Sequence, residues 1–373
     1  MEWVRLGDIA KIIMGQSPKS EHCNDTKEGL PFYQGVSDFG EIYPVPTKYC
    51  IEPKKIAEID DILIGVRAPV GDLNISNSKC CIGRGVAAIR ANEKFISKKY
   101  LYYFLKTKKQ YFDNNSTGST FKAINKSVLY ETLVPIVDIN KQKIIEDLLN
   151  RIENIIRKRK EQIQAYDDLI ESLFQTLFVR NTSGIGIIKK TMGDVMTVNQ
   201  GLQIPIAKRL KVEEENCYKY ITIKYLNGNS NTEYIKDPKE SVICRDDDIL
   251  VTRTGNTGQV ITGVTGVFHN NFFKLNYDRN VFNTIYLYSY LNTHYVQEKM
   301  KLLAGTSTIP DLNHGDFYKI DVLIPPIELQ NKFADYVLKI EEEKKKLNSS
   351  LVELETLFDA LMQDAFSGNL FKD

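Results

Sequence analysis

The chain repeats itself once, at a distance of about half its length. The segment LFQTLF that begins at Leu173 returns as LMQDAF at Leu361, which is a step of 188 residues in a chain of 373. The same step carries Gln142 onto Gln330. A repeat of this length is a whole domain with its connector rather than the short unit of a solenoid. The sequence therefore predicts two similar domains and two similar connectors.

The two connectors read as long helices with an apolar seam. Apolar residues recur in alternating steps of four and three over residues 145–177 and again over 333–365, with nine of ten seam positions apolar in each run. This spacing is the heptad pattern of a coiled coil. Neither run contains Pro or Gly. The seam residues are Ile145, Leu149, Ile152, Ile156, Ile163, Ile170, Leu173, Val337, Ile340, Leu347, Leu351, Leu354, Phe358 and Leu361.

A helix of about 40 residues is roughly 60 Å long, and one with a single apolar seam needs a partner. The partner is either the other long helix or another subunit. We favour the internal pair because length, phase and the one polar seam position, Arg159 in the first run and Lys344 in the second, match between the runs. The first run leads away from the first domain, so the second should return antiparallel to it.

The stretches between the helices mix strand and helix patterns. Strands are expected at 61–66, 85–89, 220–223, 248–252 and 320–324, and short helices at 97–106 and 281–291. We therefore expect an α+β fold with an internal pseudo-twofold repeat. Its parts are a first domain over 1–137, a central long helix over 138–182, a second domain over 183–325 and a C-terminal long helix over 326–370.

Composition narrows the class of protein. No apolar run is long enough to span a membrane and the first residues lack the apolar stretch of a signal peptide, so we expect a cytoplasmic protein. The six cysteines and four histidines show no metal-ligand spacing, which predicts reduced structural thiols and no metal. Net charge is only +1, but residues 1–137 carry +4 and residues 326–373 carry −4. That distribution allows, without requiring, a nucleic-acid partner.

No catalytic motif is present. The sequence lacks a phosphate-binding loop, a nucleophile elbow, the metalloprotease helix motif and the Asn/Asp-Pro-Pro-Tyr/Phe tetrad of amino-methyltransferases. The glycines around Arg84 predict a turn. The acidic clusters at 60–61 and 246–248 could hold a metal, but each precedes Ile-Leu in the same register, which favours turn residues that open a strand. We therefore expect no catalytic residue.

Binding residues are better represented. Each domain has an Arg just past its Asp-Ile-Leu strand, and each has a loop rich in small hydroxyls and an early loop with Gln; these types suit base edges and phosphates. Surface ion pairs and solvated loops are the alternative explanation. The candidate DNA-binding residues are Gln16, Ser17, Lys19, Arg67, Arg84, Ser119, Thr120, Lys122, Gln200, Gln203, Arg253, Asn256, Thr306, Ser307 and Thr308.

Taken together, these parts resemble the specificity (S) subunit of type I DNA restriction–modification systems. The resemblance rests on WVRLGDIA at 3–10 followed by GQSP at 15–18, on the Asp61-Ile62-Leu63 strand leading to Arg67, on the Gly-Ser-Thr loop, and on PPIELQ at 325–330 before the second long helix. The first copy keeps only Lys-Gln at 141–142 of that last motif. Each motif is short, and their order over the whole chain is what is specific.

The resemblance implies a non-catalytic subunit with two target-recognition domains on a pair of antiparallel helices. Each domain would read one half of a bipartite, asymmetric sequence in double-stranded DNA. The helices would dock two methyltransferase (M) subunits and, where they exist, restriction (R) subunits. No cofactor is expected in this chain: S-adenosylmethionine, and Mg and ATP with R subunits, would belong to the partners. A coiled-coil scaffold without DNA readout is the alternative.

Overall fold

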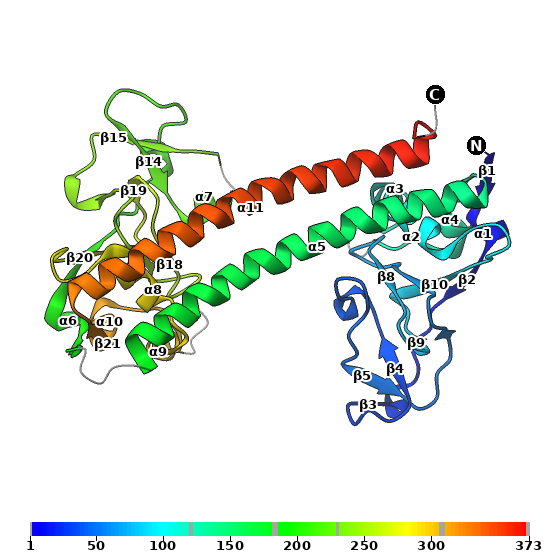
Figure 1. The fold of residues 1–373 in the computed structure, drawn as a ribbon, viewed down its shortest axis with the longest axis horizontal. Helices are drawn as coiled ribbons and strands as arrows, with labels where there is room; N and C mark the ends of the chain where they lie inside the picture. Colours follow the sequence, from blue (N-terminus) through cyan, green and yellow to red (C-terminus); the bar gives the residue numbers. More distant parts are fainter. Residues whose placement is uncertain (1, 119–121, 181–185, 229–230, 306–309, 371–373) are drawn as a thin grey trace. The chain divides into compact units, whose positions relative to one another are not determined.

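The computed structural model describes residues 2–118, 122–180, 186–228, 231–305 and 310–370. The chain divides into two units: unit 1 comprises Met1–Lys160 with Ser349–Asp373, and unit 2 comprises Glu161–Asn348. The two long helices, α5 (Ile139–Gln175) and α11 (Ile327–Ser367), each contribute one part to either unit (Figure 1). The fold class predicted from the sequence is confirmed, since both units mix short strands and helices around these long helices.

Unit 1 is built on two sheets and a two-stranded ribbon. One sheet has the order β2-β10-β7-β8, the other β3-β5-β4-β9-β6, and β1 pairs with β11. The elements are β1 Glu2–Arg5, α1 Leu6–Ile9, β2 Ala10–Met14, β3 Cys23–Asn24, β4 Leu30–Tyr33, β5 Lys48–Cys50, β6 Ile56–Ala57, β7 Ile62–Gly65, β8 Leu73–Ile75, β9 Cys80–Ile82, β10 Val86–Ala91, α2 Lys98–Lys106, α3 Lys109–Asn114, α4 Lys126–Tyr130 and β11 Leu133–Ile136.

Unit 2 repeats this plan. Its sheets have the orders β13-β20-β17-β18 and β15-β14-β19-β16, and β12 pairs with β21. The elements are β12 Ile188–Thr191, α6 Met192–Val195, β13 Met196–Gln200, β14 Cys217–Ile221, α7 Ile223–Leu226, β15 Tyr234–Lys236, β16 Ile243–Cys244, β17 Leu250–Thr252, β18 Val260–Ile261, β19 Gly266–Phe268, β20 Phe272–Tyr277, α8 Thr284–Leu291, α9 His294–Ala304, α10 His314–Tyr318 and β21 Asp321–Ile324.

The duplication extends to the mode of strand pairing. In each unit a single parallel pair, β4 with β9 and β14 with β19, lies in the second sheet, and the other named strand pairs are antiparallel. In each unit the turn after the second strand of this parallel pair, β9 or β19, leads directly into an interior strand of the first sheet, β10 or β20. The same connection therefore joins the two sheets in both units.

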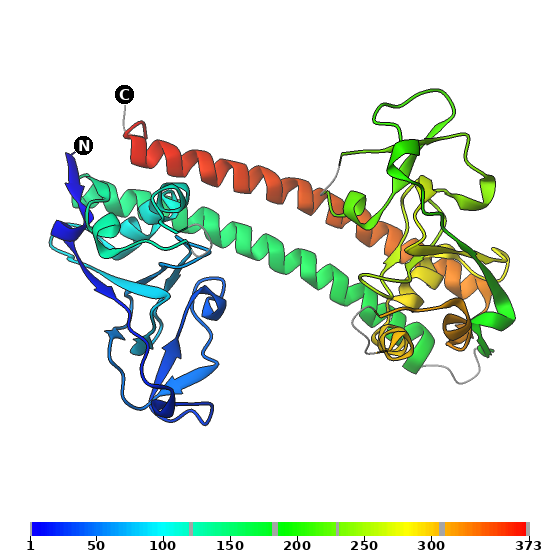
Figure 2. The same ribbon diagram turned by 180° about the vertical axis from the view of Figure 1, so that it is seen from behind.

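Within unit 1 the two long helices run in opposite directions. The backbone N–H of Tyr100 on α2 donates to Glu146 of α5 at 3.2 Å, and the Tyr100 ring lies edge-on to Phe366 of α11 at 5.2 Å between centroids. Further along α5, Lys160 forms an ion pair of 2.8 Å with Glu355. Residue numbers therefore rise along α5 while they fall along α11, as Figures 1 and 2 show for this unit.

Unit 2 shows the same antiparallel arrangement. The rings of Phe174 and Phe333 lie 5.7 Å apart, whereas Lys344 pairs with Asp167 at 2.5 Å. Lys344 is one of the two polar residues of the predicted seam, and its side chain is only 14% exposed. Its charge is therefore balanced by a carboxylate from the facing helix rather than by solvent alone.

The seam faces the interior of each unit. Ile145, Leu149, Ile152 and Ile156 are at most 9% exposed in unit 1, in one apolar core with Phe358. The other seam residues are buried or half-buried, and none is exposed. A buried apolar face is the main source of stability for a helix of this kind.

A buried glutamine fixes the start of each long helix. Gln142 and Gln330 are 1% and 0% exposed. Each side chain accepts one backbone N–H, from Ser97 and Asn283 respectively, and donates to two backbone carbonyls. The carbonyls belong to Phe95 and Val137 for Gln142, and to Val281 and Pro325 for Gln330. The repeat of this residue in the sequence thus reflects one structural task performed twice.

Several predicted boundaries were wrong by a few residues because capping side chains end or begin elements. The helix expected at 281–291 begins at Thr284, since Asn283 accepts the N–H groups of Ile285 and Tyr286. The strand expected at 220–223 is β14, which ends at Ile221 because Thr222 caps α7. α5 ends at Gln175 and continues as a π-helical turn over Thr176–Arg180.

The domain boundaries expected at 137, 182 and 325 stay a prediction, because the division into units passes through the long helices. No helix in the described ranges has the length and hydropathy needed to cross a bilayer.

Candidate nucleic-acid interface

A tight turn projects one side chain from unit 1. The N–H of Val86 donates to the carbonyl of Gly83 at 3.1 Å, which closes the turn between β9 and β10 and leaves Arg84 exposed at its tip. The loop after β2 packs on this turn, since the N–H of Gly15 donates to Val86 at 2.9 Å. A Cβ atom at Gly15 would lie 2.1 Å from the Gly83 oxygen, so only glycine permits this approach.

Unit 2 contains the same turn with different side chains. The N–H of Phe272 donates to His269 at 2.9 Å, which places Asn270 at the tip between β19 and β20. Gly201, after β13, donates to Phe272 at 3.0 Å, and a Cβ there would lie 2.1 Å from the His269 oxygen. The backbone hydrogen bonds therefore place Asn270 where unit 1 has Arg84.

The tip residue meets the adjacent loop through side chains in both units. Arg84 Nε donates to Ser17 Oγ at 3.3 Å, and Ser17 also exchanges hydrogen bonds with Gln34. In unit 2 the amide Nδ2 of Asn270 lies 3.5 Å from Gln203 Oε1. Ser17 and Gln203 both stand two residues past the glycine. Three of the candidate residues, Ser17, Arg84 and Gln203, are thus brought to two matching positions.

The two arginines past the Asp-Ile-Leu strands do not match. In unit 1 the backbone N–H of Val66 donates to the carbonyl of Gly85. In unit 2 the backbone N–H of Arg253 donates to the carbonyl of Asn271, which is the equivalent acceptor. Arg253 therefore occupies the position of Val66, and Arg67 stands one residue further on. The prediction that the two domains repeat this arginine was wrong, because a shift of one residue along an extended chain turns the side chain to the other face.

The environments of the two arginines differ accordingly. Arg253 forms a two-pronged ion pair with Asp311, with distances of 2.5 and 2.7 Å, which raises the pKa of Arg253 and lowers that of Asp311. Arg67 is exposed, and its backbone bridges to Ala123. The ion pair is what the alternative explanation anticipated for Arg253. Its DNA-binding role stays a prediction, as does that of Arg67.

Other candidates take part in local contacts. Gln200 donates to the backbone carbonyls of Asn270 and Phe272, and its Oε1 lies 2.7 Å from His314 Nε2, so its amide is committed within the domain. Lys122 pairs with Asp113 at 2.9 Å.

Lys19 pairs with Glu21 at 3.1 Å. Gln16 and Asn256 are exposed. Ser119, Thr120, Thr306, Ser307 and Thr308 lie outside the described residues.

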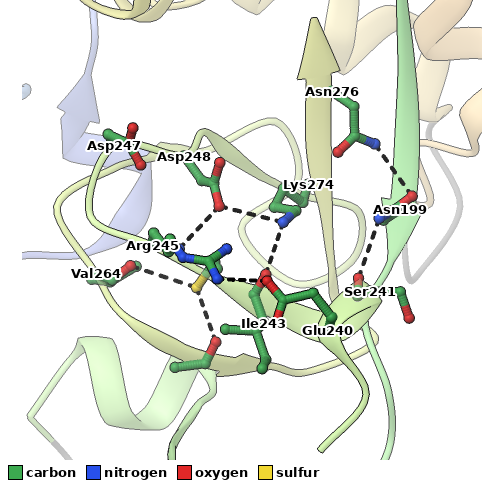
Figure 3. Close-up of polar contacts among 12 residues, drawn as sticks. Asn199, Glu240, Ser241, Ile243, Arg245, Asp247, Asp248, Val264, Lys274 and Asn276 are labelled. Carbon is green, nitrogen blue, oxygen red and sulfur yellow. Dashed lines mark hydrogen bonds and ion pairs between the residues drawn. The ribbon is translucent and has the colours of Figure 1, made fainter.

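The acidic residues that open the Asp-Ile-Leu strands organise turns and pair with cations. Asp61, 2% exposed, receives two hydrogen bonds of 2.8 Å from Arg90. Asp248 accepts the N–H of Arg245 at 3.0 Å and the ammonium of Lys274 at 3.3 Å (Figure 3). No cluster of potential metal ligands occurs among the residues described. Asp61 and Asp248 accept the backbone N–H groups of Glu58 and Arg245, which is the turn role that the sequence favoured for them.

All six cysteines lie in the described parts of the chain and are free thiols. Burial raises the pKa of Cys80 and that of Cys244 to about 11. A thiol that stays protonated is a poor nucleophile.

Sequence reasoning missed Asn270. The signal was present: a step of 186 residues carries Gly83-Arg84-Gly85 onto His269-Asn270-Asn271. None of these residues is identical between the copies, so a search for shared letters cannot find the match. The backbone hydrogen bonds reveal it.

Comparisons with known proteins agree on one family. The family profile described as "Type I restriction modification DNA specificity domain" matches residues 1–165 and 187–353. A putative type I restriction enzyme MjaX specificity subunit from Methanocaldococcus jannaschii is 42% identical over 184 residues, which is 48% of this chain and 43% of that protein. The MjaIX specificity subunit from the same organism is 21% identical over 98% of this chain and 92% of its own length.

A solved structure supports the fold. The S subunit of a type I restriction–modification system from M. genitalium aligns with a TM-score of 0.60 at 16% identity, covering 98% of this chain and 96% of that one. Similarity at this level of identity shows the same fold over the whole chain. The chain aligns with less than half the length of the MjaX specificity subunit.

Proposed function

The chain belongs to the type I restriction–modification DNA specificity domain family, and from this membership we propose that its two domains each read one half of a bipartite, asymmetric DNA target. In this proposal the chain is the specificity subunit and carries no catalytic residue of its own. Methyl transfer and, where R subunits exist, cleavage are carried out by the partners. The alternative of a scaffold without DNA readout does not account for two specificity domains.

One observation carries the proposal. The two units share the strand order of the first sheet, the helix-start glutamine and the turn geometry, yet the polar side chains at matching positions of the turn differ. Two domains that read different base sequences need the same backbone with different polar side chains at the turn, because base edges are distinguished by their donors and acceptors. The target is therefore expected to be asymmetric.

The helices α5 and α11 are the proposed docking surface for two M subunits, and they also set the gap between the half-sites. α5 is continuous over 37 residues and α11 over 41 residues. S-adenosylmethionine is expected on the M subunits, and Mg and ATP on R subunits. We place the complex in the cytoplasm, where such a system meets DNA.

The experiment uses the full chain co-expressed with a type I adenine methyltransferase (M) subunit from the same organism, in a host without its own adenine methylation. Single-molecule sequencing of the host DNA is expected to reveal one two-part motif with a fixed gap. A host that carries the methyltransferase subunit alone should show no such motif. If the full chain yields no two-part motif either, the proposed function is wrong.

A further inference from the structure

We propose that Arg84 with Ser17, and Asn270 with Gln203, are matching base-reading pairs that set one position in each half-site. The inference rests on the proposed function and adds the residues and the bases they select. Arg84 is assigned to a guanine. Asn270, assisted by Gln203, is assigned to an adenine.

The shared backbone makes the comparison meaningful. In each unit the tip residue is the second residue of a hydrogen-bonded turn. The loop that follows β2 or β13 forms two backbone hydrogen bonds with that turn. The second bond runs from Gln16 to Ile82 at 3.0 Å, and from Leu202 to Phe268 at 3.0 Å. Two inter-loop bonds and a glycine at the contact hold the tip and its neighbour in the same relation. What differs between the units at this turn is the tip side chain and its exposure, since Arg84 is exposed and Asn270 is half-buried.

That chemistry matches two different bases. A guanidinium donates two parallel hydrogen bonds, which fit the O6 and N7 acceptors of guanine in the major groove. A carboxamide has one donor and one acceptor, which fit the N7 and N6 groups of adenine. Arg84 is exposed, and the hydroxyl of Ser17 accepts a hydrogen bond from its Nε, so in this proposal the two terminal nitrogens donate to the base.

The hydrogen-bonding capacity of the Asn270 carboxamide is not fully used within the described part of the protein. Its Oδ1 is the one buried side-chain oxygen or nitrogen in the described part of the protein that has no hydrogen-bond partner. Its Nδ2 contact to Gln203 is long, at 3.5 Å. A buried acceptor without a donor is unfavourable, so rotation of the amide onto a base edge would gain a donor for Oδ1 that the free protein does not supply.

Cations beside the Asn270 tip suit the neighbouring phosphates. His269 and Asn271 line a hollow of about 500 Å³ together with the exposed Lys224 and with Arg209, whose guanidinium is paired with Glu233. Gln203 lines a second hollow that includes Lys208 and Lys239. Phosphate contacts fix the register of a protein on DNA, whereas base contacts specify the sequence. The arrangement places both kinds of group around one turn.

The test exchanges the pair in one domain only. The double variant Gln203→Ser with Asn270→Arg gives unit 2 the side chains of unit 1, and the methylated motif is again read with the M subunit present. One adenine in the second half-site is expected to become guanine, while the first half-site and the gap stay unchanged. Arg245→Ala, which removes an exposed arginine elsewhere in unit 2, serves as the control and should leave the motif intact.

Asn270→Ala and Arg84→Ala keep the proposal falsifiable if the exchange variant does not assemble. Each should lose about ten- to hundredfold of the discrimination at one position of one half-site. Arg84→Ala acts on the first half-site and Asn270→Ala on the second. A wild-type two-part motif that both alanine variants retain in full would overturn this inference alone. The absence of any two-part motif with the wild-type chain would instead contradict the proposed function.

Discussion

At the scale of single residues, the duplicated carboxylate shows how the two copies have diverged. Arg90 pairs with Asp61, and Lys274 pairs with Asp248. These two cations do not occupy equivalent positions in the two copies. From the strand registers, the counterpart of Arg90 is Asn276 and the counterpart of Lys274 is Ala88. The two cations thus stand two residues apart on equivalent strands, and residues two apart share a face. Each copy keeps the carboxylate and supplies the opposite charge from a different position.

The first prediction concerns Asp61. Asp61→Asn removes a buried charge that receives two hydrogen bonds from Arg90 and also caps Glu58, so unit 1 should lose about 3 kcal/mol of unfolding free energy. The fluorescence of Trp3, the one tryptophan of the chain, reports this unit during urea unfolding. Asp60→Asn is the matched control, because Asp60 is exposed and its ion pair with Lys98 is worth little. Equal losses for both variants would contradict this account.

The second prediction concerns pH. Burial, and then the charges of Arg253 for His314 and Arg209 for His269, lower the pKa of both histidines. The folded state therefore binds fewer protons than the unfolded chain near pH 6.5, and unit 2 should lose stability as pH falls below that value. Asp311, whose pKa is lowered, adds no loss until pH approaches 4.

Calorimetric unfolding of the full chain at pH 7.5 and 5.5 tests this pH dependence. His314→Gln, which keeps a donor toward Gln200, should reduce the difference between the two transition temperatures. An undiminished pH dependence in this variant would show that His314 does not contribute.

The residue scale also shows where sequence reasoning stopped. The turn role of Asp61 and Asp248 followed from their register before Ile-Leu. The pairing of Arg67 with Arg253 failed by one residue, because Arg67 stands six residues after Asp61 whereas Arg253 stands five residues after Asp248. Asn270 was invisible, since the turn it occupies shares a backbone but no residue identity with the turn of Arg84. Gly15 and Gly201, which allow the adjacent loop to approach each turn, repeat in the sequence, whereas the turn residues themselves differ.

At the scale of elements, the start of each long helix is the best-determined feature. Gln142 and Gln330 each satisfy three backbone groups that lie between a short helix, a strand end and the long helix. The sequence showed that these residues repeat, but their task could not be read from it, because two of the three main-chain partners of each glutamine lie more than 40 residues away.

The third prediction follows from these contacts. Gln330→Leu keeps a similar volume but leaves one buried N–H and two buried carbonyls without their partner, so the unfolding free energy should fall by about 3 kcal/mol. Gln142→Leu should behave alike. Far-UV circular dichroism during urea unfolding provides the measurement. Gln164→Leu, at an exposed position on α5, should change stability by only about 0.5 kcal/mol. The proposed role of the glutamines would be disproved if the buried variants matched this control.

At the scale of the whole molecule, the heptad pattern of the two long helices predicted most of the fold. The seam predicted two antiparallel helices, and each unit contains such a pair, with Lys160 meeting Glu355 and Asp167 meeting Lys344. Periodicity succeeds here because a long apolar stripe admits one solution, burial against a matching stripe. The short strands and loops of the two domains carry weaker patterns, and their boundaries depend on single capping residues.

The central claim is that this pair of helices sets the distance between two DNA readers, and helix length tests it most directly. One heptad is inserted into α5 after Ile163 and one into α11 before Leu347, so that the seam keeps its phase in both helices. The insertion adds about 10 Å of helix, equivalent to about three base pairs of DNA. The methylated motif is expected to keep both half-sites and to gain about three base pairs between them. An unchanged gap between unchanged half-sites would contradict the account.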